Sequence, residues 1–316
     1  MITFFMNPDI TASNKILEII YIVMGLICIY AAVKNALDKE NPSRVGTAVF
    51  WGALGVVMAI GRWLPPMVGG AIIIIMALPA VLKKVKIGKT NAPTEKETAK
   101  QSEKIGMKIF IPAFSMGVFA ILFALFTKLG ALVGIGFGVL VSVIVLMVFD
   151  SKENKPTTFL VDSERFLGIV GPLCMLPMLL ASLGAIFTAA GVGDVVAGLV
   201  GNIVPQGNIN VGIIVYAIGM MLFTMIMGNA FAAITVMTAG IGYPFVMAYG
   251  VNPVLIGMLA LTCGYCGTLM TPMAANFNIV PVAMLGIKDK YGVIKNQIFV
   301  ALPLLVFQII YMILFK

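Results

Sequence analysis

The chain consists largely of long, continuous apolar runs, such as residues 71–82 and 298–315. A helix that crosses a bilayer needs about 20 mostly apolar residues, whereas a spanning β-strand shows about ten residues of alternating character. Because 60% of the 316 residues are apolar and only 11% are charged, an ordinary soluble domain is excluded. The sequence therefore predicts an all-α polytopic membrane protein in contact with the lipid bilayer.

The spacing of the runs predicts about nine transmembrane helices, and the composition divides the chain in two. The first five spans form an N-terminal helical scaffold over residues 1–149. The polar stretch 150–165 is a predicted linker, and residues 166–316 make up a second half of different character. The nine expected spans are 16–33, 45–60, 64–82, 109–127, 131–149, 166–190, 211–227, 251–287 and 296–315.

The net charge of +8 is carried almost wholly by residues between the apolar runs, which argues against a nucleic-acid-binding surface. Segment 83–108 holds eight lysines against three glutamates, and lysine-rich loops stay on the cytoplasmic side. Counting spans outward from it places Lys155 and Arg165 inside and Arg62 outside. We interpret the segment as a solvated cytoplasmic loop, with lipid-headgroup or partner binding as the alternative.

Between residues 166 and 287 the only charged side chain is that of Asp194, yet Gly, Pro, Asn and Thr interrupt the apolar runs. Within a bilayer, broken backbone persists only where protein or a water-filled cavity satisfies its polar groups. Residues 191–208 are too short and too polar to cross, and we expect a lateral amphipathic helix there. Asp194 is either the N-cap of that helix or part of a permeation path.

The first interrupted segment is 228–250. Gly228 and Asn229 are expected at a bend, and Thr235 and Thr238 at or near the tip of a re-entrant helical hairpin. The alternative is a full crossing that is bent by a proline.

The second interrupted segment is 251–287, which is expected to contain a helix unwound near mid-membrane. Pro272 removes a helical N–H and disfavours helix at Thr271. Freed carbonyls and neutral side chains suit a cation such as Na⁺, whereas half-helix N-termini suit an anion. Close packing by small residues is the alternative. The candidate substrate- and ion-binding residues are Gly228, Asn229, Thr235, Thr238, Gly267, Thr268, Thr271, Asn276 and Asn278, with Na⁺ assigned to Thr268, Thr271 and Asn276.

The chain contains no histidine, which excludes histidine-based proton relays and Ser-His-Asp triads. We therefore do not expect an enzyme, a cofactor or a tightly held metal ion. Glu18 lies near the start of an apolar run, where a carboxylate is expected to reach the surface. Cys263 and Cys266 form a C-x-x-C inside an apolar run, and helix packing is expected to explain them better than redox or metal chemistry.

Three motifs carry a resemblance, namely GAIFTAAGVGDVVAGLV, GNAFAAITVMTAGIGYPF and CGYCGTLMTPMAANFNIVP. The second half resembles one repeat of the ion-transporter superfamily, which includes permeases for gluconate, citrate and dicarboxylates. The whole chain resembles an uncharacterised bacterial permease family of unknown-function domains. Genes of that family commonly lie beside a second small membrane protein and a pyroglutamyl-peptidase. The resemblance implies secondary active transport of a small organic anion, such as 5-oxoproline, and a location in the cytoplasmic (inner) membrane of a bacterium.

A complete transporter of the superfamily has two pairs of hairpin and unwound helix, whereas this chain shows one pair. We therefore expect a subunit of a Na⁺-coupled transporter whose site is completed by a second membrane subunit or by a second copy in a homo-oligomer. A non-transporting membrane assembly subunit is the alternative.

Overall fold

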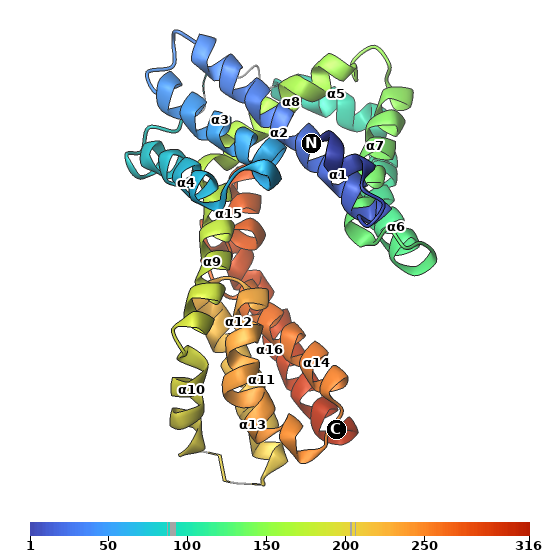
Figure 1. Cartoon of the computed structure of the whole chain (residues 1–316). Coiled ribbons are helices and arrows are strands. Elements are labelled where there is room, and N and C mark those ends of the chain that lie inside the picture. The colour runs from blue at the N-terminus through green and yellow to red at the C-terminus, as the bar shows by residue number, and fades with distance from the viewer. Residues whose placement is uncertain (87, 89–92, 203, 206) are drawn as a thin grey trace. The chain divides into compact units, whose positions relative to one another are not determined.

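The computed structural model describes residues 1–86, 88, 93–202, 204–205 and 207–316, and this part of the chain is helical with no strand (Figure 1). The predicted all-α membrane class is confirmed. The chain forms two compact units, Met1–Gly171 and Pro172–Lys316. In both units the long apolar runs of the sequence therefore form helices.

Over its described residues the first unit contains eight α-helices and two 3₁₀ turns. In chain order they are α1 (Ile2–Met6), α2 (Ala12–Leu37), α3 (Arg44–Ile60), η1 (Gly61–Trp63), α4 (Pro66–Val81), α5 (Glu95–Ile105), η2 (Gly106–Ile109), α6 (Phe110–Phe126), α7 (Ala131–Phe149) and α8 (Pro156–Val170).

Small residues let the helices of this unit approach closely. A Cβ at Gly25 of α2 would lie 2.6 Å from the carbonyl oxygen of Gly55 in α3, so any larger residue would separate these helices. In the α6–α7 pair, Ser115 and Ser142 place their hydroxyl oxygens 2.7 Å apart, and Ser142 also donates to the carbonyl of Pro112 at 2.6 Å. Close backbone approach and hydroxyl pairing are the usual means of holding helices together in lipid.

Glu18 does not reach the surface, and that expectation is wrong. Its side chain is buried, and its Oε2 accepts a hydrogen bond of 2.6 Å from Nε of Arg62. The Arg62 guanidinium also stacks over the ring of Phe4, at 4.7 Å from the ring centroid. Because an unpaired carboxylate in an apolar bundle is costly, the arginine of η1 is what permits Glu18 in α2.

The second unit contains the interrupted helices. Its elements are η3 (Gly171–Cys174), which begins at the last residue of the first unit, α9 (Met175–Ala189), α10 (Val192–Gly201), α11 (Ile209–Met227), α12 (Ala230–Met237), the π-helical turn η4 (Thr238–Gly242), α13 (Tyr243–Phe245), η5 (Met247–Tyr249), α14 (Pro253–Leu269), α15 (Ala275–Met284) and α16 (Gly292–Phe315).

The core of this unit lies between α11, α14 and α16. Tyr216, Ile256 and Met312, one from each helix, are fully buried there. A Cβ at Gly267 of α14 would lie only 2.3 Å from the carbonyl oxygen of Met221 in α11. Gly267 is therefore a packing residue, which brings the α11 and α14 backbones together just before α14 ends.

Nine spans are not confirmed. Within the described residues seven helical segments are long and apolar enough to cross a membrane, or eight if the bent pair Ser182–Ala189 and Val192–Gly201, at 69°, is one span. Helices α4, α9 and α14 are 16, 15 and 17 residues long, which is short of a crossing at 1.5 Å per residue. The seven are Ala12–Leu37, Arg44–Trp63, Lys96–Phe126, Ala131–Phe149, Ile209–Met227, Ala230–Tyr249 and Gly292–Phe315.

The structure also shows which elements occupy the predicted linker, 150–165, and the stretch 191–208. The stretch 150–165 consists of a short connection followed by most of α8. Within 191–208, where a lateral helix is expected, the structure places α10, whose N-cap is Gly191 with φ +70°. Asp194 is thus not the N-cap. It lies in the first turn, where a carboxylate still favours the positive end of the helix. Residues 203 and 206 of that segment, and 87 and 89–92 of the basic loop, lie outside the described residues.

Candidate functional site at two helix breaks

The first break separates α11 from α12. Gly228 ends α11 in the left-handed conformation, with φ +68°, and its N–H donates to the carbonyl of Thr224 at 2.6 Å. Glycine adopts this conformation without a Cβ penalty. Asn229 then begins α12 as its N-cap, because its Oδ1 accepts hydrogen bonds from the N–H groups of Phe231 at 2.9 Å and Ala232 at 3.3 Å. The sequence Gly-Asn therefore closes one helix and opens the next.

The re-entrant hairpin predicted over 228–250 is not confirmed. Residues Ala230–Tyr249 form one helical segment of 20 residues that is long and apolar enough to span, with the π-helical turn η4 in its middle. Pro244 stands at the start of the short α13, where a missing N–H is tolerated. Thr238 does not form a tip, because its hydroxyl lies 2.6 Å from the Tyr216 hydroxyl of α11. The alternative of a bent crossing fits these observations.

The second break separates α14 from α15, as the position of Pro272 predicts. Helix α14 ends at Leu269 and α15 starts at Ala275, so the intervening carbonyls lose their helical partners. Asn278 of α15 replaces those partners. Its Nδ2 donates to the carbonyl oxygens of Thr268 at 2.8 Å and Thr271 at 2.6 Å. One buried amide thus satisfies two of the freed carbonyls.

The two breaks lie against each other inside the second unit. The Thr271 hydroxyl donates to the carbonyl of Met225 in the last turn of α11, at 2.7 Å. A Cβ at Gly228 would lie 2.6 Å from both the carbonyl carbon and the oxygen of Met273. Segments 45 residues apart in the chain therefore share one junction, at which α12 and α15 both begin.

The junction gathers five of the nine predicted site residues. Gly228, Asn229, Thr268, Thr271 and Asn278 belong to it through the contacts above, and Gly267 lies just before it as a packing residue.

The other predicted site residues contribute less to the junction. Asn276 lies in the first turn of α15 with its side chain exposed. Thr235 is exposed on α12 and donates to the carbonyl of Ala232 at 3.0 Å. At 1.5 Å per residue it stands about 9 Å along the helix from Asn229. Thr235 and Thr238 therefore point to no common centre with the break.

Two buried oxygens near the junction have no hydrogen-bond partner within the described residues. They are Oγ1 of Thr224 in α11 and Oδ1 of Asn278 in α15, and both side chains are fully buried. Native proteins satisfy most such groups, so an unpartnered pair is a candidate for ligand contact. Sequence reasoning missed Thr224. A signal was present, since it is a hydroxyl four residues before the Gly-Asn break.

The charge around the junction comes from backbone rather than side chains. No Asp, Glu, Lys or Arg occurs from 195 to 287. Helix α15 has no side-chain N-cap at Ala274, so its first N–H groups are not satisfied by a side chain. Over the part of the chain that the structure describes, no group of three or more His, Cys, Asp or Glu side chains could hold a metal ion. The arrangement can offer the uncapped N-terminus of α15 to an anion and neutral oxygens to a small cation.

Two broken helices that meet inside an apolar bundle, together with seven candidate spans among the described residues, define a multi-pass helical membrane protein. The chain belongs to the DUF979 family, described as protein of unknown function, which it matches over residues 18–316. No curated protein and no solved structure matches it.

Proposed function

We propose that the protein is a subunit of a secondary transporter for a small organic anion. The observation that carries this proposal is the meeting of the two breaks at Gly228 and Met273. Paired interrupted helices whose half-helix N-termini converge form the substrate and ion sites of many secondary transporters. A helix interruption that served packing alone would not need two breaks in contact with each other.

The expected substrate is a monocarboxylate, and 5-oxoproline is the first candidate, on the gene neighbourhood that the family resemblance implies. With no arginine or lysine between 166 and 287, a carboxylate would be held by backbone N–H groups and by amide or hydroxyl donors. Asn276 suits this role because it is exposed in the first turn of α15. Asn229 already accepts from two of the first N–H groups of α12, so the first turn of α15, which has no side-chain cap, is the one proposed to meet the carboxylate.

Na⁺ is the proposed coupling ion. The hydroxyl protons of Thr268 and Thr271 are donated to the carbonyls of Tyr265 and Met225. Oγ1 of Thr271 also accepts from the N–H of Met273 at 3.2 Å, which leaves one lone pair on that oxygen to accept a cation. Oδ1 of Asn278 is a third, unpartnered oxygen. A proton-coupled mechanism would instead need a carboxylate or a histidine beside the junction, and the sequence from 195 to 287 contains no Asp, Glu or His.

A second subunit or a second copy of the chain is proposed to complete the site. The second break has an exposed edge, which consists of Pro272, Met273, Asn276 and Phe277. An apolar edge of this kind, next to a polar junction, suits contact with another membrane chain. An assembly subunit that does not transport is the second candidate, and the same exposed edge would serve it.

Uptake into vesicles tests the proposal. The chain should be reconstituted alone and with the small membrane protein encoded beside its relatives, and supplied with radiolabelled 5-oxoproline and other small carboxylates. The double variant Asn229→Ala, Asn276→Ala should lose uptake. Asn252→Ala is the matched control, because Asn252 caps α14 through the same two bonds, to Val254 and Leu255, at the other end of that helix.

Three outcomes would contradict the proposal in different parts. Uptake that is unchanged in the double variant removes the junction as the binding site. Uptake that continues without Na⁺ but stops when the proton gradient is dissipated removes the coupling ion. If the chain assembles with its partner, and every variant of the junction leaves both assembly and uptake intact, the assembly subunit is the better description.

A further inference from the structure

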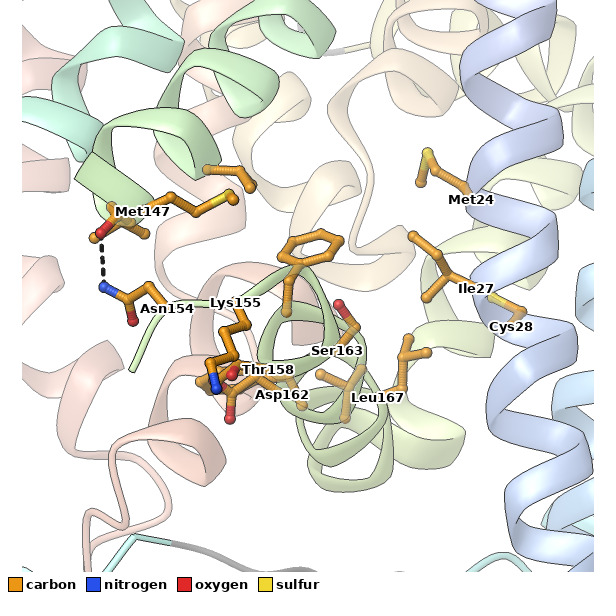
Figure 2. Close-up of a pocket in the computed structure, with 15 residues that line it drawn as sticks. Met24, Ile27, Cys28, Met147, Asn154, Lys155, Thr158, Asp162, Ser163 and Leu167 are labelled. Atoms are coloured by element: carbon orange, nitrogen blue, oxygen red, sulfur yellow. Dashed lines mark hydrogen bonds between the residues drawn. The ribbon is translucent and has the colours of Figure 1, made fainter. Parts of the chain in front are cut away.

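The first unit contains a cavity of about 530 Å³ that the proposed transport site does not use. Helix α8 forms one wall, and residues of α2 and α7 form the others (Figure 2). This volume is within the range of small-molecule sites, about 300–1,000 Å³. All the residues that line it lie between Met24 and Val170, so the cavity belongs to the first unit alone.

The lining changes from polar to apolar along α8. At the N-terminal end of the helix, Lys155, Thr158 and Asp162 gather at one end of the cavity, as Figure 2 shows. One to two turns further on, the same face presents Phe166, Leu167 and Val170. Helix α8 is 15 residues long, so the gradient extends over about 20 Å.

The opposite walls continue the apolar part of the cavity. Helix α2 contributes Met24, Ile27 and Cys28, and α7 contributes Leu146 and Met147 (Figure 2). A space lined in this way holds water poorly, because a stable water needs two to four polar partners. In a chain embedded in a bilayer, an acyl chain is the apolar material at hand.

The polar end carries a net positive charge. Asp162 is neutralised by Arg165, whose Nη2 lies 3.0 Å from Oδ1 of the carboxylate. Within the described residues Lys155 forms no ion pair, so its ammonium remains to meet an anion. The sequence also places this end, between α7 and α8, on the cytoplasmic side, where anionic lipids attract basic residues.

We propose that this cavity is a binding site for an anionic phospholipid, with one acyl chain along the apolar face of α8 and the phosphate beside Lys155. The occupant is taken from the bilayer rather than from solution, because the apolar walls account for most of the lining. The site is separate from the helix breaks, and its occupancy would stabilise the packing of α8 against α2 and α7.

Native mass spectrometry of the purified full chain tests this site. Phosphatidylglycerol, added to delipidated protein in detergent, should give a one-lipid adduct, and phosphatidylethanolamine should bind more weakly. Leu167→Trp fills the cavity and should abolish the adduct. Val161→Trp is the matched control, since Val161 is exposed on α8 and does not line the cavity.

The headgroup contact is tested by Lys155→Gln, with Lys152→Gln as the control from the same connection. Loss of one cation near the headgroup should weaken phosphatidylglycerol binding about fivefold, and the control should not change it. A variant that keeps Cys28 as its single cysteine gives an independent measure of lipid occupancy. Lipid in the cavity should slow the modification of the Cys28 thiol by an apolar maleimide.

Several results would overturn the site. They are an adduct that survives Leu167→Trp, equal binding of the two lipids, and competition by glycerol phosphate without acyl chains, which would indicate a free-phosphate site. A dimer that is lost only in Leu167→Trp would show that a second copy of the chain occupies the cavity instead.

Discussion

The side-chain amide nitrogen of Asn278 lies 2.6 Å from the carbonyl oxygen of Thr271, seven residues earlier in the chain. The same nitrogen lies 2.8 Å from the carbonyl oxygen of Thr268. A broken helix leaves carbonyls that cannot turn to water within a bilayer, and here a single buried amide satisfies two of them. The break is therefore a built structure rather than a loosely ordered loop.

Asn278→Ala should destabilise the protein by about 3 kcal/mol, because it leaves two buried carbonyl oxygens without donors. The measurement is the free energy of unfolding in detergent micelles. Asn276→Ala, on the exposed side of the same helix, should change stability by no more than about 0.5 kcal/mol. Equal effects of the two variants would show that the Asn278 amide does not hold the break.

Alanine substitution at Gly228 and Gly250 separates two effects, backbone strain at positive φ and the clash of a new Cβ with neighbouring atoms. Both glycines have positive φ, +68° and +85°, so alanine at either position costs about 1 kcal/mol of backbone strain. Only at Gly228 would the new Cβ also meet backbone, at 2.6 Å from Met273, whereas nothing lies within 4 Å of it at Gly250. Gly228→Ala should therefore lower thermal stability clearly more than Gly250→Ala.

Uptake gives a second measurement on the same pair of variants. If the contact between the breaks forms the site, Gly228→Ala should reduce uptake at temperatures where the protein is still folded, and Gly250→Ala should not. Equal stability and equal uptake in both variants would mean that the two breaks do not need to touch.

The sequence predicts the junction well because the residues that build it have strong local preferences. Gly-Asn favours a left-handed helix end followed by an N-cap, and Thr-Pro favours a helix stop. Both breaks form at these positions. Their contact with each other depends on tertiary packing of α11 against α14, for which Gly267 is the only local sign.

The hairpin and the count of spans were less predictable. The Thr and Gly residues near 238–242 predict a polar tip, but they form a π-helical turn. In this turn Gly242 packs on the Tyr216 ring, and the Thr238 hydroxyl lies 2.6 Å from the Tyr216 hydroxyl. Glu18 likewise read as a surface residue, because its partner Arg62 is 44 residues away in the sequence. Long-range partners of polar groups are what a single sequence conceals.

Acid should destabilise the connection between the basic loop and α7. Asp150 follows α7 directly, and a hydrogen bond and ion pair with Lys104 of α5 hold the pKa of its carboxyl below the usual value of 3.8. A carboxyl whose pKa is lower in the folded state stabilises the fold above the unfolded pKa and loses that contribution as pH falls through the folded value. Stability should therefore drop below about pH 4, where the unfolded carboxyl titrates.

Lys104→Gln should flatten this part of the pH profile, measured as unfolding temperature in micelles between neutral and acid pH. Lys100→Gln is the control, since Lys100 lies on the same helix and forms no ion pair within the described residues. If the loss of stability at acid pH is the same in both variants and in the unmodified protein, it arises from other carboxyl groups.

Thr271 and Thr235 distinguish a binding junction from a general need for polar groups in the second unit. Thr271→Val keeps the β-branched shape but removes the hydroxyl that donates to the Met225 carbonyl at 2.7 Å, so the two breaks lose a direct bond and the proposed ion loses an oxygen. Thr235→Val removes only a bond to the Ala232 carbonyl on an exposed helix face. Thr271→Val should destabilise the protein by about 1 kcal/mol and lower uptake at least about tenfold, the effect of 1.4 kcal/mol in binding.

The control variant Thr235→Val should leave both stability and uptake unchanged. If Thr235→Val impairs uptake as strongly as Thr271→Val while stability is preserved, the substrate path extends along α12 and the site is not confined to the junction.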